Sequence, residues 1–186
     1  MVKLDKIVTK AGDGGQTRLA TGEQVSKAHV RVEAYGAVDE ANSALGVARL
    51  YTKDTPLDAI LARVQNDLFD LGADLATPLT ATFEALRVSE AQVERLEREI
   101  EALQESQASL TSFVLPGGSP AAAHLHLARA IARRAERASV ALAEAEQISP
   151  TAIKYINRVS DLLFVAARTA NDDGAADVLW TPGANR

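Results

Sequence analysis

Apolar residues recur every three or four positions along most of this chain, which is the spacing of one face of an α-helix. The pattern predicts five helical segments, which begin near residues 29, 56, 89, 119 and 149. The first extends to about Tyr51, the second stops at Pro78, the third has a seam that reaches Leu103, and the last two extend to about Glu146 and Asn171. The apolar residues of the fifth segment point in several directions, so we expect this helix to be central.

Three of these segments begin with residues that can satisfy the free N–H groups of a first helical turn. Ser89 is followed three residues later by Gln92, which is the pattern of a capping box. The fourth and fifth segments each begin with the pair Ser-Pro, at residues 119–120 and 149–150, which places proline at the first helical position.

The first 28 residues have several glycines and no persistent period, and only a short strand at Lys6-Ile7-Val8 is compatible with them. We therefore expect one all-α domain over residues 1–186. It consists of a glycine-rich N-terminal arm (1–28), a five-helix bundle (29–171) and a flexible tail (172–186).

Composition narrows the classes of function. The chain contains no cysteine, which excludes disulfides, thiolate zinc sites and iron–sulfur clusters. The formal net charge of -5 gives no overall attraction to nucleic acid or to an anionic membrane. The chain begins without an apolar leader and has no run of about 18 apolar residues, so we expect a cytoplasmic protein.

The fourth segment carries an unusual concentration of arginine. At about 100° per residue, one helix face holds His126, Arg129, Arg133, Glu136 and Arg137. The opposite face is expected to hold Leu127, Ile131, Ala135, Ala138 and Leu142. Like charges one turn apart repel each other, so an anion bound across them is one interpretation. The alternative is a solvated face compensated by Glu136 and by the acidic third segment.

The N-terminal arm combines glycines with cations and hydroxyls: Thr9-Lys10-Ala11-Gly12-Asp13-Gly14-Gly15-Gln16-Thr17-Arg18. Glycine allows consecutive backbone N–H groups to turn toward an anion. The segment has neither the P-loop nor the dinucleotide-binding pattern, so by itself it is equally typical of a turn.

Polar residues also interrupt the other helices. Asp39 and Asn42 lie nearly on one face of the first segment, and Asn157, Asp161 and Arg168 share a face of the fifth. Such stripes occur at binding sites and also on plain exposed surfaces. His124 and His126 project about 200° apart, which makes them a poor metal-binding pair. With no nucleophile elbow and no dedicated carboxylate pair, an enzyme of this kind should need little proton transfer.

Six blocks of residues, in order along the chain, resemble one family: the PduO-type ATP:cob(I)alamin adenosyltransferases. The blocks are Thr9-Lys10-x-Gly12-Asp13-x-Gly15-x-Thr17, Lys27-x-x-x-Arg31-x-Glu33-Ala34-Tyr35-Gly36-x-Val38-Asp39-Glu40-x-Asn42-Ser43, Gln65-Asn66-Asp67-Leu68-Phe69-Asp70-Leu71-Gly72, Phe113-Val114-Leu115-Pro116-Gly117-Gly118-Ser119, Arg129-x-x-x-Arg133-Arg134-Ala135-Glu136-Arg137 and Asn157-Arg158-Val159-Ser160-Asp161-Leu162-Leu163-Phe164. The departures are small: Ala11 stands where the family often has threonine, and Ala41 and Ala167 stand where larger aliphatic residues are common.

The resemblance implies a five-helix bundle that assembles as a homotrimer, with ATP and a corrinoid bound between subunits. It implies that the nucleotide is bound by Thr9, Lys10, Ala11, Gly12, Asp13, Gly15, Thr17, Arg18, Lys27, Arg133, Arg134, Ala135, Glu136, Arg137 and Asn157. It also implies that Asp39 and Arg129 bridge two subunits beside the corrinoid, and that Phe113 displaces the lower axial ligand of cobalt.

In that family the cobalt of cob(I)alamin attacks the 5′ carbon of ATP, and the products are adenosylcobalamin and triphosphate. The resemblance therefore implies ATP, Mg²⁺ and cob(I)alamin or cob(II)alamin as substrates and cofactors, with Glu136 or the ATP phosphates holding the metal. A reductase and a cobalamin-dependent client enzyme are further expected partners; nucleic acid and membrane are not.

Two other classes of function remain open from the sequence. One is a non-catalytic helical module that binds ATP or an acidic partner through the arginine stripe. The other is an ATP-dependent kinase or phosphohydrolase, which would release ADP or orthophosphate instead of intact triphosphate.

Overall fold

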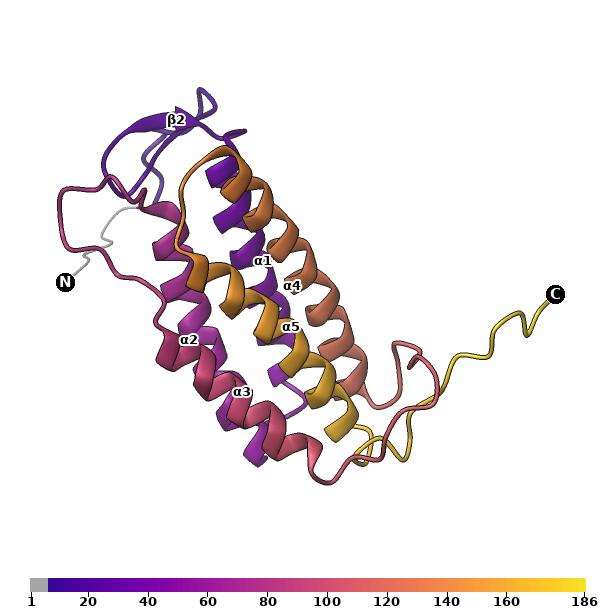
Figure 1. The fold of residues 1–186 in the computed structure, drawn as a ribbon. Helices are drawn as coiled ribbons and strands as arrows, with labels where there is room; N and C mark the ends of the chain where they lie inside the picture. Colours follow the sequence, from indigo (N-terminus) through magenta and orange to yellow (C-terminus); the bar gives the residue numbers. More distant parts are fainter. Residues whose placement is uncertain (1–6) are drawn as a thin grey trace.

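Five α-helices form the bundle that the hydrophobic pattern predicts, in a computed structural model that describes residues 7–186 (Figure 1). The helices are α1 (Val30–Arg49), α2 (Pro56–Ala76), α3 (Glu90–Gln104), α4 (Pro120–Ala145) and α5 (Pro150–Thr169). Helix α5 packs against α3 on one side and α4 on the other, while α1 packs against α4 and α2. The predicted fold class, a five-helix bundle, is confirmed.

The helix starts follow the capping chemistry of the sequence. Ser89 and Gln92 form the reciprocal capping box at α3, and Ser119 Oγ accepts a hydrogen bond from the N–H of Ala122 at 3.1 Å. Ser149 stands at the N-cap of α5 but its side chain makes no capping bond. Pro150 at the first helical position therefore marks this helix start without help from Ser149.

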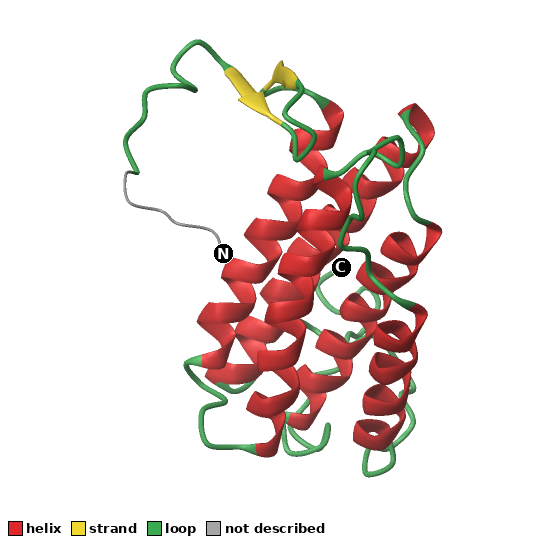
Figure 2. Cartoon of the chain, turned by 90° about the vertical axis from the view of Figure 1, so that its left-hand side faces the viewer, coloured by secondary structure: helices red, strands yellow, loops and turns green. Residues whose placement is uncertain are grey.

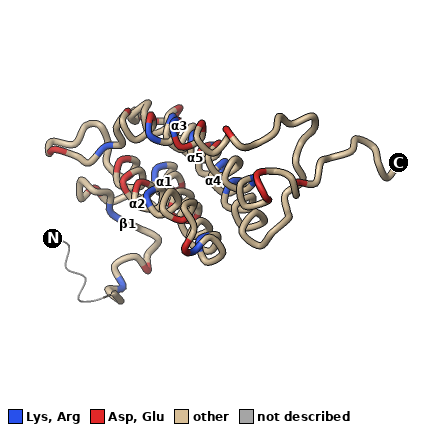
Figure 3. Tube along the Cα trace, turned by 90° about the horizontal axis from the view of Figure 1, so that it is seen from below, with Lys and Arg blue, Asp and Glu red and all other residues tan. Residues whose placement is uncertain are grey.

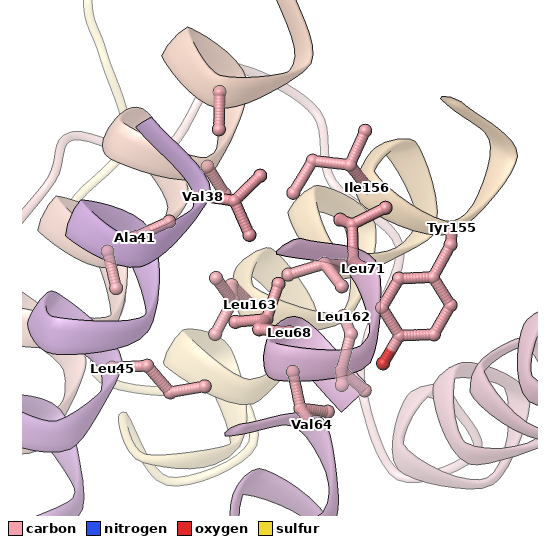
Figure 4. Close-up of a cluster of buried hydrophobic side chains, with 14 of the residues drawn as sticks. Val38, Ala41, Leu45, Val64, Leu68, Leu71, Tyr155, Ile156, Leu162 and Leu163 are labelled. Atoms are coloured by element: carbon pink, nitrogen blue, oxygen red, sulfur yellow. The ribbon is translucent and has the colours of Figure 1, made fainter. Parts of the chain in front are cut away.

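The core lies around α5, which is buried on most sides. Tyr155, Ile156, Leu162 and Leu163 pack against Val38, Ala41 and Leu45 of α1 and Val64, Leu68 and Leu71 of α2 (Figure 4). The phenol of Tyr155, fully buried, donates a 2.8 Å hydrogen bond to Asp67 of α2. The expectation that the fifth helix is central is correct.

The N-terminal arm contains a two-stranded hairpin that the sequence reading missed. Strand β1 (Gln16–Arg18) pairs antiparallel with β2 (Gln24–Ser26), and the hairpin lies at one end of the bundle (Figure 2). The strand allowed at residues 6–8 is not there: Lys6 is outside the described residues, and Ile7 and Val8 are exposed and irregular.

The two predicted faces of α4 are wrong at two positions. His126, placed on the polar face, is 2% exposed, and Leu127, placed on the apolar face, is 56% exposed. The reason is that α4 is covered on two sides, since it packs against both α1 and α5. A helix covered from two directions has a wider buried sector than a single stripe.

The beginning of the segment expected to be a flexible tail is tied to the body of the protein. Asp177 forms a buried ion pair with Arg168 at the end of α5, with an N–O distance of 2.9 Å. Arg168 therefore does not extend the exposed stripe of Asn157 and Asp161. None of the helices described is long and apolar enough to cross a membrane.

The end of the bundle that carries the hairpin depends on one buried arginine. Arg31, 1% exposed, donates hydrogen bonds to the carbonyl of Leu75 and, from Nε and Nη2, to Oε2 of Glu146 at 3.1 and 2.6 Å. These acceptors stand at the C-terminal ends of α2 and α4. One guanidinium thus satisfies groups at two helix ends where backbone carbonyls lack helical partners.

Replacing Arg31 with alanine should lower the free energy of unfolding by about 3 kcal/mol, because it leaves a half-buried Glu146 and a buried carbonyl without a partner. Urea unfolding followed by circular dichroism measures this change. The control is Arg98→Ala, because Arg98 and Glu94 form an exposed pair at 4.0 Å. The control should change the free energy by less than about 0.5 kcal/mol. Equal losses in the two variants would contradict the role given to Arg31.

Candidate functional site

An open groove of about 570 Å³ runs along the outer face of α5, between α3 and α4. We call it the α5 groove. Arg129 and Arg133 line it from α4, Glu97 and Glu101 from α3, and Asp161 and Phe164 from α5. The predicted arginine face of α4 therefore opens into a groove with charged residues on both walls. Figure 3 shows where basic and acidic residues stand along α3, α4 and α5.

Arg129 and Arg133 have no ion pair with a carboxylate in the part of the chain that the structure describes. The Nε of Arg129 is buried and has no hydrogen-bond partner. Burial lowers the pKa of Arg129, and the charge of Arg133 lowers it further. Both effects disfavour the charged guanidinium, and an anion placed between the two arginines would oppose them.

Glu97 and Glu101 of α3 line the same groove as these arginines but form no ion pair with them. Glu97 instead accepts a 2.9 Å hydrogen bond from Arg158, which also pairs with Asp161 at 2.7 Å. Glu97 and Asp161 thus hold Arg158, while Arg129 and Arg133 form no ion pair among the described residues.

One end of this arginine face is ordered by hydrogen bonds. Between α4 and α5, Asn157 donates a 2.8 Å hydrogen bond to Glu136; within α4, Arg137 donates to the carbonyl of Arg133 at 3.0 Å. These predicted site residues are thus brought together with Arg133. The other carboxylate oxygen of Glu136 accepts no hydrogen bond from the residues that the structure describes.

Two predicted nucleotide-binding residues of α4 lie elsewhere. Arg134 points toward α1 and forms ion pairs with Glu40 and Glu33. Ala135 is completely buried in the core. The structure does not place either side chain in the α5 groove, because helical geometry turns residues 134 and 135 away from residue 133.

The N-terminal arm forms a second concave site, the arm pocket, of about 530 Å³. The predicted residues Thr9, Ala11, Gly12, Thr17, Arg18 and Lys27 line it. Gln16 and Gln24, which the sequence reading did not select, line it as well. Their positions follow from the hairpin pairing, which a motif search in the arm could not supply.

Local backbone geometry explains the composition of the arm. A Cβ built on Gly12 would lie 2.9 Å from Nζ of Lys27, so glycine is what lets this cation approach the chain. Lys10 and Gly15 have positive φ, of 61° and 74°, and form tight turns beside Asp13. Lys10, Asp13 and Gly15 shape the arm in this way, although they do not line the pocket.

The remaining predicted residues lie apart from one another within one chain. Asp39 lines a shallow groove between α1 and α2 together with Phe69, whereas Arg129 lines the α5 groove. Phe113, on the loop before α4, has 76% of its surface exposed. The arm pocket and the α5 groove share no lining residue.

A resident metal site built from protein ligands is not present in the described residues, which contain no cluster of three His, Asp or Glu side chains. Mg²⁺ prefers a few carboxylate oxygens together with phosphates and waters. Glu136 is a carboxylate of this kind beside Arg133, so it fits a magnesium ion that arrives with phosphate groups.

His126 is the feature of this region that the sequence reading explained least. It lies one helical turn before Arg129, edge-on to the ring of Phe164, with the ring centroids 6.2 Å apart. Neither of its ring nitrogens has a hydrogen-bond partner. Burial lowers the pKa of His126; the charge of Arg129 acts in the same direction, and Asp177 opposes both.

Comparisons with known proteins give one consistent answer. The family model described as cobalamin adenosyltransferase matches residues 7–170. A corrinoid adenosyltransferase of Mycobacterium tuberculosis is 46% identical over 190 residues, covering 100% of this chain and 97% of the relative. A corrinoid adenosyltransferase of Bacillus subtilis is 43% identical over 178 residues, covering 93% and 91%.

Solved structures of similar proteins point to the same family. A phenylalanine-to-alanine variant of a PduO-type ATP:corrinoid adenosyltransferase from Lactobacillus reuteri, in complex with cobalamin and ATP, superposes with a TM-score of 0.89. It is 40% identical in sequence and the match covers 94% of this chain and 99% of that one.

The lowered pKa of His126 predicts a pH dependence of stability. The unfolded chain takes up the proton near the ordinary value of 6.5, and the folded chain takes it up only at lower pH. Folding should therefore weaken as the pH falls from about 7 to about 5, because protons then favour the unfolded state. His126→Phe should reduce this dependence, measured by urea unfolding at each pH.

The matched control is His124→Gln, because His124 is only partly buried and stacks on Tyr51. This variant should keep the pH dependence of the unsubstituted protein. The assignment fails if His126→Phe and the unsubstituted protein lose the same stability between the two pH values.

Proposed function

The chain belongs to the cobalamin adenosyltransferase family and transfers the adenosyl group of ATP to the cobalt of a corrinoid; within this reaction, we propose that the α5 groove and the arm pocket hold the triphosphate of ATP. The observation that carries the proposal is Arg133, which lines the α5 groove one turn from Arg129 and forms no ion pair with a carboxylate of the described residues.

Triphosphate has the charge and the length that these cations require. Arg133 and Arg137 would bind phosphate oxygens from one side, and Lys27 and Arg18 of the arm from the other. Asn157 holds Glu136 in place, and Glu136 would receive Mg²⁺ with its waters. The magnesium ion would neutralise part of the phosphate charge.

The reaction requires little proton transfer by groups of the protein. In cob(I)alamin the cobalt is itself the nucleophile; it forms a bond to the 5′ carbon as the bond from this carbon to the triphosphate oxygen breaks. The electron pair of that bond leaves with the triphosphate. The protein must hold the two substrates in line and stabilise the charge that develops on the leaving group. Arginine and lysine do this without a catalytic acid or base.

Phe113 would act on the corrinoid. Its ring is largely exposed on the loop before α4, where an apolar side chain has no structural benefit by itself. We assign it the role of excluding the lower axial ligand of cobalt, which makes reduction to Co(I) easier. A reductase would supply the electron, and a cobalamin-dependent enzyme would accept the product.

Assembly as a homotrimer would join the parts that one chain keeps separate. Asp39 and Arg129 line different grooves, so a bridge between them requires two copies of the chain. The apolar groove beside Asp39 and the exposed Phe69, 69% of whose surface is accessible, would supply the contact area.

The reaction itself is tested anaerobically with chemically reduced cob(I)alamin, ATP and Mg²⁺. We expect adenosylcobalamin in the visible spectrum and intact triphosphate among the products. Arg133→Ala should lower turnover by about 100-fold, because one cation that stabilises the leaving group is lost.

Arg98→Ala serves again as the control and should turn over normally. Release of ADP or orthophosphate would point to a kinase or phosphohydrolase. Saturable ATP binding with no change of the corrinoid would favour a binding module. Normal turnover by Arg133→Ala would refute the assignment of the triphosphate site.

Light scattering tests the assembly, and we expect three times the mass of the chain. Asp39→Arg should dissociate the oligomer by placing two arginines against each other, and the double variant Asp39→Arg with Arg129→Asp should restore it. A monomer for the unsubstituted protein, or no rescue by the charge exchange, contradicts the proposed bridge.

A further inference from the structure

The segment after α5 returns to the loop that carries Phe113 and pairs with it. The N–H of Leu115 donates to the carbonyl of Val178 at 2.8 Å, and the N–H of Trp180 donates to the carbonyl of Phe113 at 2.7 Å. Ser112 Oγ donates to the carbonyl of Trp180 at 2.6 Å. The position of Trp180 is therefore fixed relative to Phe113 by three hydrogen bonds.

The two aromatic rings stand together at the surface. Their centroids are 6.0 Å apart and the ring planes are inclined by 50°, a tilted arrangement that aromatic pairs favour. Phe113 is 76% exposed and Trp180 43% exposed, so the pair contributes little to the core. Two large aromatic side chains held side by side in water form a surface suited to a flat apolar ligand.

A buried ion pair holds this surface in place. Asp177, three residues before Trp180, accepts hydrogen bonds from Arg168 at 2.9 Å and from Asn171 at 3.0 Å, one on each carboxylate oxygen. Arg168 also donates to the carbonyl of Ala108, and Asn171 to that of Gly117, on either side of Phe113. The same two residues thus anchor both segments that carry the rings.

The anchor lies next to the arginine face of α4. The carboxylate of Asp177 acts on the imidazole of His126, which is one turn from Arg129. The anchor residues Arg168 and Asn171 stand at the C-terminal end of α5, away from the end where Asn157 meets Glu136.

We propose that Trp180 joins Phe113 in a two-ring wall against the corrin ring of the substrate, and that Asp177 is the residue that positions Trp180. The inference rests on the proposed function, and it adds a residue of the tail to the corrinoid site. The corrin is a flat macrocycle that carries methyl groups as well as amide side chains at its edge, and its face is a broad surface for aromatic contact. Two inclined rings cover more of it than one, and they exclude water from the side of cobalt where a lower ligand binds.

The first experiment compares Trp180→Ala, Trp180→Phe and Phe83→Ala in the adenosylation assay. Phe83 is a matched control, because it is 50% exposed and lies on the loop between α2 and α3. Trp180→Ala should raise the KM for cobalamin by about tenfold, the effect of losing roughly 1.4 kcal/mol of contact. The KM for ATP should stay unchanged. Trp180→Phe should restore most of the affinity, and Phe83→Ala should match the unsubstituted protein.

The second measurement is the visible and magnetic spectrum of cob(II)alamin bound with ATP. Trp180→Ala should form less of the four-coordinate species, as Phe113→Ala should. Asp177→Asn, with Trp180 present, should show the same two changes in smaller size, because the ring is kept but its anchor is weakened. Where Asp177→Asn fails to fold, the two Trp180 variants decide the question alone.

The inference is overturned if Trp180→Ala keeps the cobalamin KM and the four-coordinate spectrum. It is also overturned if this variant raises the KM values for ATP and cobalamin equally, since that result indicates a general loss of structure. Failure of the proposed function looks different: the unsubstituted protein would then form no adenosylcobalamin. Loss of the spectrum in Phe113→Ala alone would retain the proposed function and reject only the role of Trp180.

Discussion

Burial of α5 on most of its surface is the constraint on which the rest of the structure depends. Tyr155, Ile156, Val159 and Leu162 need apolar neighbours in several directions, and no single helix can provide them. Helices α2, α3 and α4 therefore surround α5 and leave only a narrow stripe uncovered. That stripe, with Asp161 and Phe164, becomes the floor of the α5 groove, so the position of the site follows from the packing of the core.

Helix α4 packs into the core on one side and carries arginines on another. Ala128, Ala132 and Ala135 are completely buried, and their small side chains allow a close approach between helices. With apolar contact satisfied there, the remaining surface is free for Arg129 and Arg133. Burial and, second, the charge of Arg133 lower the pKa of Arg129. Binding of a polyanion, as we propose, would relieve the repulsion between the two cations, which the fold positions in advance.

The hydrophobic pattern predicted the five helices because each helix is long enough to contain many apolar positions that repeat at helical spacing. It missed the hairpin because strands of three residues offer too few positions for a period to appear. Helical spacing places Glu136 one turn from Arg133, and the contact of α4 with α5 brings Asn157 to Glu136; the binding role of these residues stays a prediction. The burial of His126 and the pairing of Arg168 with Asp177 depend on where the segment after α5 packs against the bundle. The spacing of apolar and polar residues along the chain does not indicate that position.

The distance between the two regions that we propose to bind phosphate supports a site shared between copies. Glu146 at the end of α4 contacts Arg31 at the start of α1, which fixes the arm beside that end of the bundle. Arg133 stands thirteen residues before Glu146, or about 20 Å along the axis at 1.5 Å per residue. A triphosphate is shorter than that, and the arm pocket and the α5 groove have no lining residue in common. We therefore propose that the arm that reaches a triphosphate bound at Arg133 belongs to a neighbouring copy, so that assembly would be a condition of catalysis.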